Sequence, residues 1–193
     1  MMKKLLYIDA CIRGKDSRTK RIAGPIVEKL KERYDIETYV LNDMDLTIVK
    51  EELVTRRNNG DIDGQVLKWA ETVRDADRIV VSAPFWDMSI PAALKNFFEL
   101  CSIFDVTFKS DDKTCYGNCK AEKMLYITTR GMDIDTGNEL EQATSYLKAL
   151  SWLWGIGPLQ TVSAQNMDYV SEDEINEKID KAIKEGLEIA ECF

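Results

Sequence analysis

Short apolar runs alternate with longer amphipathic stretches along the whole chain. The runs lie at 5–8, 36–41, 79–81, 124–127 and 159–162, and each predicts a strand. Between them, apolar residues recur at helical spacing over 19–33, 66–75, 91–102 and 139–154, and a last helix begins with the capping box Ser171-Glu172-Asp173-Glu174. This alternation predicts an α/β fold in which a doubly wound, five-stranded parallel sheet is covered by helices on both faces.

The helical spacing also predicts which side chains are buried. These are Ile22, Ile26, Val27 and Leu30 in the first helix, Leu94, Phe97, Phe98 and Cys101 in the helix at 91–102, and Ile175, Ile179, Ile183, Leu187 and Ala190 in the last. Residues 42–61 show weak periodicity and contain Asn58-Asn59-Gly60, which predicts a long surface loop with at most a helical turn. No linker or composition shift divides the chain, and at roughly 150 residues per domain residues 1–193 are expected to form one domain.

The charge balance limits the partners of this chain. It has 26 Lys and Arg against 34 Asp and Glu, a formal net charge of −8. Binding to nucleic acid or to an anionic membrane surface needs clustered basic residues, so neither is expected. The sequence contains no apolar run long enough to span a membrane and no pattern of a secretory signal, and a cytoplasmic location is expected.

The absence of histidine limits the chemistry. It excludes Ser-His-Asp and Cys-His hydrolases, most zinc enzymes and any histidine general base. Of the five cysteines, Cys115 and Cys119 are spaced Cys-x-x-x-Cys with no fourth ligand nearby, so free thiols rather than a metal site are expected. Reactions would depend on other side chains or on a cofactor.

Three loops follow the carboxyl ends of predicted strands, where open parallel sheets bind their ligands. Residues 9–19 end in Asp16-Ser17-Arg18-Thr19 at a helix start, which suits an anion, although the residues alone are more typical of an ordinary helix cap with surface charges. Residues 82–90 hold two aromatics and a Met, which either pack in the core or at a subunit interface, or stack on a planar cofactor. Residues 128–137 contain a polar turn with Gly131. A nucleoside-triphosphate P-loop is absent.

A longer pattern within these segments is more specific. Residues 83–99, Val106-Thr107-Phe108 and residues 123–131 resemble the FMN-dependent NADH azoreductase / NADH:quinone oxidoreductase family. The resemblance implies a flavodoxin-like three-layer α/β/α fold with strand order 2-1-3-4-5, a homodimer, and FMN as cofactor. It further implies that NADH or NADPH reduces a quinone, an azo compound or another flat aromatic acceptor by ping-pong hydride transfer through flavin N5.

The resemblance also implies which residues form the site. It assigns the FMN phosphate to Cys11, Ser17, Arg18 and Thr19, although the family usually has Ser at the position of Cys11. It assigns the isoalloxazine to Pro84, Phe85, Trp86, Asp87 and Met88. It assigns the pyrimidine edge of the ring to Thr129, Arg130, Gly131 and Met132. Phe104, Phe108 and Tyr116 are expected to wall the acceptor pocket, partly against the other subunit. No side-chain acid or base is implied, because the flavin carries the reaction.

Two other functions stay open at this point. A flavodoxin-like electron carrier would bind FMN and pass single electrons to a protein partner, which an acidic surface also suits. A scaffold that no longer binds flavin would keep the fold without the reaction.

Overall fold

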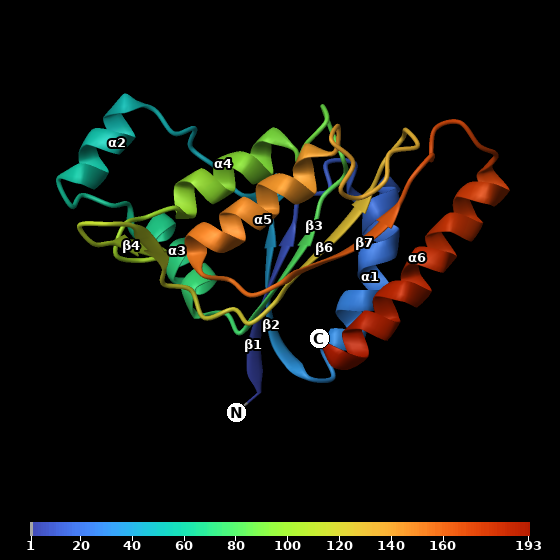
Figure 1. Cartoon of the computed structure of the whole chain (residues 1–193), viewed down its shortest axis with the longest axis horizontal. Coiled ribbons are helices and arrows are strands. Elements are labelled where there is room, and N and C mark those ends of the chain that lie inside the picture. The colour runs from blue at the N-terminus through green and yellow to red at the C-terminus, as the bar shows by residue number, and fades with distance from the viewer. Residues whose placement is uncertain (1) are drawn as a thin grey trace.

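The computed structural model describes residues 2–193 and is built on a central parallel sheet. Its strands, in spatial order, are β2 (Tyr34–Val40), β1 (Lys3–Asp9), β3 (Arg78–Ser82), β6 (Met124–Thr129) and β7 (Leu159–Ala164). These are the five strands predicted from the apolar runs, and they lie in the predicted order. Their carboxyl ends point to the upper edge of the molecule in Figure 1.

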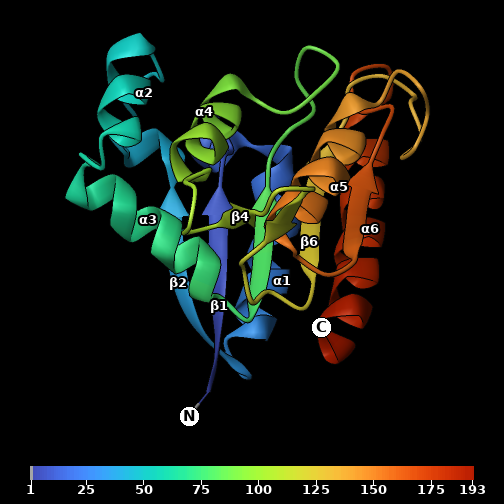
Figure 2. The same cartoon turned by 60° about the vertical axis from the view of Figure 1, so that its left-hand side comes forward.

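Helices cover both faces of the sheet, which confirms the three-layer arrangement (Figures 1 and 2). One face is covered by α1 (Arg18–Leu30) and α6 (Glu172–Cys192), the other by α3 (Gly64–Asp75), α4 (Ala92–Cys101) and α5 (Gln142–Trp154). The central strands β1, β3 and β6 are therefore buried on both sides, as their continuous apolar character requires.

The predicted buried faces of α1 and α4 are confirmed, but that of α6 is partly wrong. Ile183 and Leu187 are only half-buried. The residues that face α1 at this point are small: a Cβ on Gly186 would lie 2.1 Å from Cδ1 of Ile26. Because α6 approaches α1 so closely there, the larger side chains are displaced to the edge of the contact.

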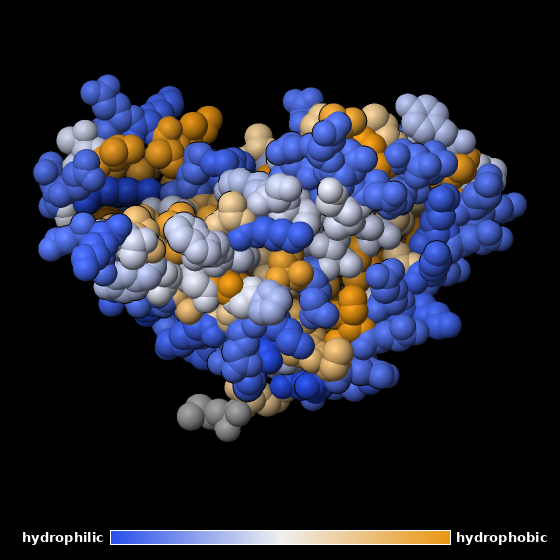
Figure 3. Space-filling view, in the orientation of Figure 1, coloured by the Kyte–Doolittle hydropathy of each residue, from blue (hydrophilic) through white to orange (hydrophobic). Residues whose placement is uncertain are grey.

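Residues 42–61 are more ordered than predicted. They contain a short 3₁₀ turn (Leu41–Asp43) and the eight-residue helix α2 (Glu51–Asn58), which stands apart from the sheet at the upper left of Figure 1. Apolar side chains gather around α2 in Figure 3, yet none of its residues is fully buried. The Arg57 guanidinium donates to the carbonyls of Glu99 and Leu100 at the end of α4, at 3.1 and 2.8 Å. This tertiary contact stabilises a helix that is too short and too exposed to leave a clear periodicity.

A small antiparallel hairpin that the sequence did not predict follows α4. It consists of β4 (Phe108–Ser110) and β5 (Cys115–Gly117). Gly117 packs against Gly155 at the end of α5, where a Cβ on Gly117 would lie 1.9 Å from the Gly155 nitrogen. The hairpin is thereby held at the far ends of α4 and α5, away from the carboxyl edge of the sheet (Figure 1). None of the helices within residues 2–193 has the length and apolar character needed to cross a membrane.

Candidate cofactor site

A cleft of about 120 Å³ opens at the carboxyl edge of the sheet. Its walls come from all three predicted loops and from a fourth, after β7. The lining residues are Ile12, Arg13, Ser17, Arg18, Thr19, Pro84, Phe85, Trp86, Thr129, Arg130, Gly131, Met167 and Asp168. Nine of the thirteen predicted cofactor residues therefore lie together, although they come from segments that are far apart in the chain.

The first wall is the start of α1. Ser17 is the N-cap residue, and its hydroxyl accepts from the Lys20 amide at 3.2 Å. The amides of Arg18 and Thr19 belong to the first turn and have no partner within the helix, so they are available to an anion. The Thr19 hydroxyl pairs with that of Thr129 at 2.7 Å, which ties this turn to the end of β6. This wall combines amides, hydroxyls and a guanidinium, a donor set that suits a phosphate.

The second wall is the segment after β3, which ends in a strained turn. Trp86 and Ser89 exchange two backbone hydrogen bonds of 2.9 Å, and the two residues between them, Asp87 and Met88, have φ values of 52° and 66°. Two left-handed residues in a two-residue turn favour Asn and Gly, so Met88 is held there at a conformational cost. The turn leaves Phe85 buried and Trp86 52% exposed. An exposed indole beside a cleft is a surface on which a planar ring can stack.

The third wall uses the backbone of residues 129–131 rather than the Arg130 side chain. Arg130 is fully buried, and its guanidinium turns away to donate to the Ile134 carbonyl at 3.0 Å and to the Thr136 hydroxyl at 2.9 Å. It also lies 3.9 Å from the buried carboxylate of Glu141, which caps α5. Burial lowers the pKa of Arg130, and Glu141 opposes that shift. The Arg130 side chain thus supports the loop behind the cleft.

The fourth wall, after β7, was missed by sequence reasoning. The amides of Asn166, Met167 and Asp168 donate to the carbonyls of Met132, Arg130 and Gly131, at 2.9 to 3.1 Å. The signal was available, because the rule that ligands bind beyond the carboxyl ends of strands applies to the last strand as well. Ile12 and Arg13, in the first loop, were also missed.

Four predicted cofactor residues do not line the cleft. Cys11 is buried behind it, where its thiol lies 3.7 Å from the Ser82 carbonyl oxygen. Burial raises the pKa of this thiol to about 12, so it is protonated and carries no charge. Asp87 is exposed at the tip of the turn, Met88 packs toward the core, and Met132 is exposed.

The three residues predicted for the acceptor pocket also lie outside the cleft of a single chain. Phe104 and Phe108 stack edge to face with ring centroids 6.0 Å apart, and Tyr116 is on the same hairpin. Phe104 is 52% exposed and Tyr116 47%. These aromatic side chains form a separate surface at the far end of α4.

The buried polar groups beneath the cleft hold its floor in place. Asp9 ends β1 and is almost fully buried; its carboxylate accepts from the Cys11 amide at 3.0 Å and pairs with the Lys20 ammonium at 2.7 Å. The hydrogen bond that the Lys20 ammonium donates to Asp9 raises the pKa of Lys20. This pair fixes the first turn of α1 to the end of β1.

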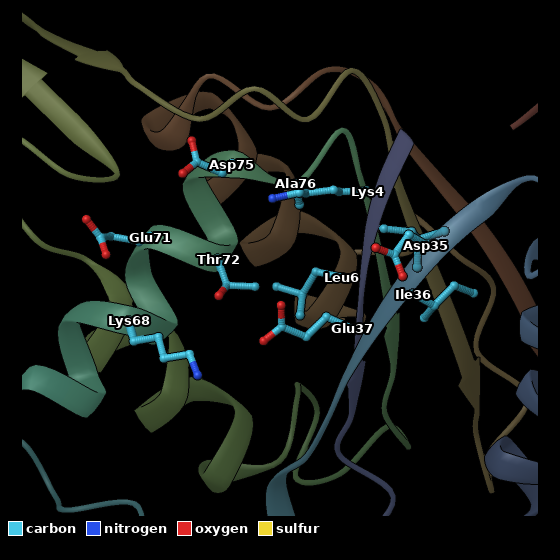
Figure 4. Close-up of a pocket in the computed structure, with 11 residues that line it drawn as sticks. Lys4, Leu6, Asp35, Ile36, Glu37, Lys68, Glu71, Thr72, Asp75 and Ala76 are labelled. Atoms are coloured by element: carbon cyan, nitrogen blue, oxygen red, sulfur yellow. The ribbon is translucent and has the colours of Figure 1, made fainter. Parts of the chain in front are cut away.

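A larger hollow, of about 440 Å³, lies elsewhere, between β2 and α3. Figure 4 shows Lys68 and Thr72 on α3 extending toward Glu37 on β2, while the carboxylates of Glu71 and Asp75 point away from the strand. Four carboxylates and only two lysines line this hollow, a net negative charge that disfavours a phosphate, and it has no helix N-terminus or exposed indole. Within residues 2–193 no group of three or more His, Cys, Asp and Glu side chains is placed to hold a metal ion.

Comparison with known proteins agrees with this geometry. A family model described as a flavodoxin-like fold matches residues 3–188. FMN-dependent NADH:quinone oxidoreductase 2 of Clostridium acetobutylicum is 30% identical over 182 residues, which cover 89% of this chain and 90% of the relative. The FMN-dependent NADH:quinone oxidoreductase of Caldicellulosiruptor saccharolyticus is 29% identical over the full length of both.

Solved structures show the same fold. An azoreductase of Bacillus anthracis superposes with a TM-score of 0.86 at 20% identity over 100% of both chains. An FMN-dependent NADH-azoreductase of that species, in complex with FMN, superposes with a TM-score of 0.84 at 23% identity over 98% of each chain. The family match over nearly the whole chain, together with the relative at 30% identity, shows that this chain belongs to the flavodoxin-like family that includes the FMN-dependent NADH:quinone oxidoreductases.

Proposed function

We propose that this protein binds FMN and uses NADH to reduce quinones, azo compounds or similar flat acceptors. The observation that carries the proposal is the cleft itself, in which a helix N-terminus with hydroxyl donors, an exposed indole and a close-packed glycine meet at one edge of the sheet. The names of the relatives support it, since they are NADH:quinone oxidoreductases rather than electron carriers. This favours the enzyme over the carrier.

The residues of the cleft fit the three parts of FMN. The hydroxyl of Thr19, the first-turn amides and the Arg18 guanidinium would hold the phosphate. Trp86 and Phe85 would lie along the isoalloxazine. Gly131, which has no side chain to fill the third wall, would let the backbone approach the polar edge of the ring.

The bound flavin would supply hydride transfer, so the protein needs no acid or base of its own. The chain would orient the ring against Trp86, shield one side of it from water and neutralise the phosphate. No histidine is present, and the buried Cys11 thiol remains protonated at neutral pH, so neither offers a competing proton acceptor. The acceptor would then react at the open side of the cleft.

A homodimer would complete the acceptor pocket. The aromatics at the β4–β5 hairpin, Phe104 and Tyr116, are exposed and do not line the cleft of their own chain. An exposed aromatic surface is typical of a subunit interface, and in a symmetric dimer such a surface can meet the cleft of the partner. Light scattering should give twice the chain mass, and Phe104→Ala should raise the KM for the acceptor while the affinity for FMN stays the same.

The proposal is tested by purifying the protein and adding NADH under anaerobic conditions. We expect a yellow protein whose bound FMN is bleached by NADH and recovers its colour when a quinone is added. Steady oxidation of NADH with a small quinone, without any added reductase, separates the enzyme from the electron carrier. A protein that binds no FMN when the cofactor is in excess would refute the proposal and favour the scaffold.

A further inference from the structure

Asp168 occupies a fixed position at the mouth of the cleft. Its amide donates to the Gly131 carbonyl at 3.1 Å, and the preceding amide, of Met167, donates to the Arg130 carbonyl at 3.1 Å. The turn after β7 is therefore fastened to the turn after β6 by its backbone. The backbone position of Asp168 is therefore fixed relative to Gly131.

The carboxylate of Asp168 reaches two groups that the proposed function assigns to the cofactor. One oxygen, Oδ1, pairs with Nη1 of Arg18 at 2.7 Å. The other, Oδ2, lies over Gly131, where a Cβ would come within 2.0 Å of it. Asp168 thus covers the glycine of the third wall and pairs with the guanidinium of the first.

The pair is placed so that a phosphate can compete with it. The Arg18 side chain is 30% exposed and that of Asp168 is 62% exposed, so solvent screens their attraction and the pair is weak. A phosphate at the start of α1 would carry nearly two negative charges and would contact the same guanidinium. Asp168 would then face a like charge across a short distance.

We infer that Asp168 competes with the phosphate of FMN for Arg18 and so limits how strongly the cleft prefers FMN to riboflavin. This inference rests on the proposed function and adds to it a residue that determines specificity. Riboflavin has the same ring system but no phosphate, so it gains nothing from Arg18 and presents no anion for Asp168 to repel. A contact of the ring edge with the side chain above Gly131 is common to both flavins, and the isosteric Asn keeps it. The effect of Asp168 is therefore expected on one flavin and not on the other.

The test measures the dissociation constants of FMN and riboflavin on flavin-stripped protein, by quenching of flavin fluorescence at one ionic strength. We expect Asp168→Asn to bind FMN about tenfold more tightly than the wild type, with riboflavin affinity changed by less than about twofold. Asp133→Asn removes the same charge from an exposed residue of the neighbouring loop and should alter neither constant. In an Arg18→Gln background the gain from Asp168→Asn should fall to about twofold.

Each other outcome has a distinct meaning. Unchanged or weaker FMN binding by Asp168→Asn would overturn the inference, because Asp168 would then position Arg18 rather than compete for it. Equal tightening of both flavins would also overturn it, since the charge of Asp168 would then act on the ring that both flavins share and not on the phosphate. If the wild type binds FMN, the proposed function survives either result; if it binds neither flavin, both proposals fail. Thermal unfolding checks that the variant is folded, and Asp168→Ser replaces it if it is not.

Discussion

The buried ion pair behind the cleft makes a sharp prediction about stability. Arg130 and Glu141 are both fully buried, with 3.9 Å between Nη2 of Arg130 and Oε2 of Glu141. Replacing Arg130 by Met keeps most of the apolar stem but removes two hydrogen bonds and leaves the Glu141 carboxylate buried without its cation. Removing one partner of such a pair costs about 3–5 kcal/mol. We expect Arg130→Met to lower the free energy of unfolding by this amount, measured by urea denaturation at pH 7 on flavin-free protein.

Two further variants identify the cause. The double variant Arg130→Met/Glu141→Gln buries no charge at this site. In the wild type the Glu141 carboxylate accepts from the Thr144 amide at 2.9 Å, and the side-chain amide oxygen of the introduced Gln can accept the same hydrogen bond. It should recover about 1–2 kcal/mol relative to Arg130→Met. Arg56→Met is the matched control, because Arg56 and Asp61 form a shorter ion pair, of 2.7 Å, whose two side chains are exposed to solvent. If burial rather than distance decides, this control leaves the urea midpoint nearly unchanged. A cost below about 1 kcal/mol for Arg130→Met, or no recovery in the double variant, would refute the reasoning.

Three other predictions follow from single contacts. Ser17→Ala removes the N-cap of α1 and should lower the free energy of unfolding by about 1 kcal/mol, with a larger loss of affinity for FMN than for riboflavin in the same titrations. Gly186→Ala places a Cβ 2.1 Å from Cδ1 of Ile26 and should cost about 1–3 kcal/mol in urea denaturation, and Ile26→Val should relieve part of the cost. Burial raises the pKa of Cys11 from 9.0 to about 12. Below pH 9 the Cys11 thiol is protonated in both the folded and the unfolded state, but between pH 9 and 12 only the folded state keeps the proton. The free energy of unfolding should therefore fall as the pH rises through that window, and it should fall less steeply in Cys11→Ser, which lacks the thiol. The argument for Cys11 would be contradicted if stability fell equally steeply with alkaline pH in the wild type and in Cys11→Ser. The other two arguments would be contradicted if Ser17→Ala or Gly186→Ala left the free energy of unfolding unchanged.

The five strands and most helices were predictable because their signal is local. A strand buried on both faces must be apolar along its length, and a helix covering it must repeat its apolar residues, whichever partners it meets. α2 was not predictable in this way. Its eight residues bury little, and its position depends on the contact of Arg57 with the end of α4, a contact between residues more than forty positions apart.

Much of the site was predicted for a similar reason. The rule for parallel sheets brings together the loops that hold Ser17 and Pro84 and the end of β6 at Thr129, and the resemblance to the family assigned these residues to the cofactor. The rule does not say which way a side chain points. Cys11 and Arg130 were expected at the cofactor, and the structure turns both side chains inward, because each finds buried hydrogen-bond partners there.

The sequence alone determined the order of the elements, the sheet they form and the edge at which a ligand can bind, since these follow from patterns of burial that each segment carries within itself. Only the tertiary structure decided that Asp168 meets Arg18 across 150 residues of chain, that the hairpin aromatics stay away from the cleft of their own chain, and that α6 contacts α1 through a glycine. Such contacts depend on the relative placement of segments that share no local pattern, and packing fixes that placement only when the whole core is assembled.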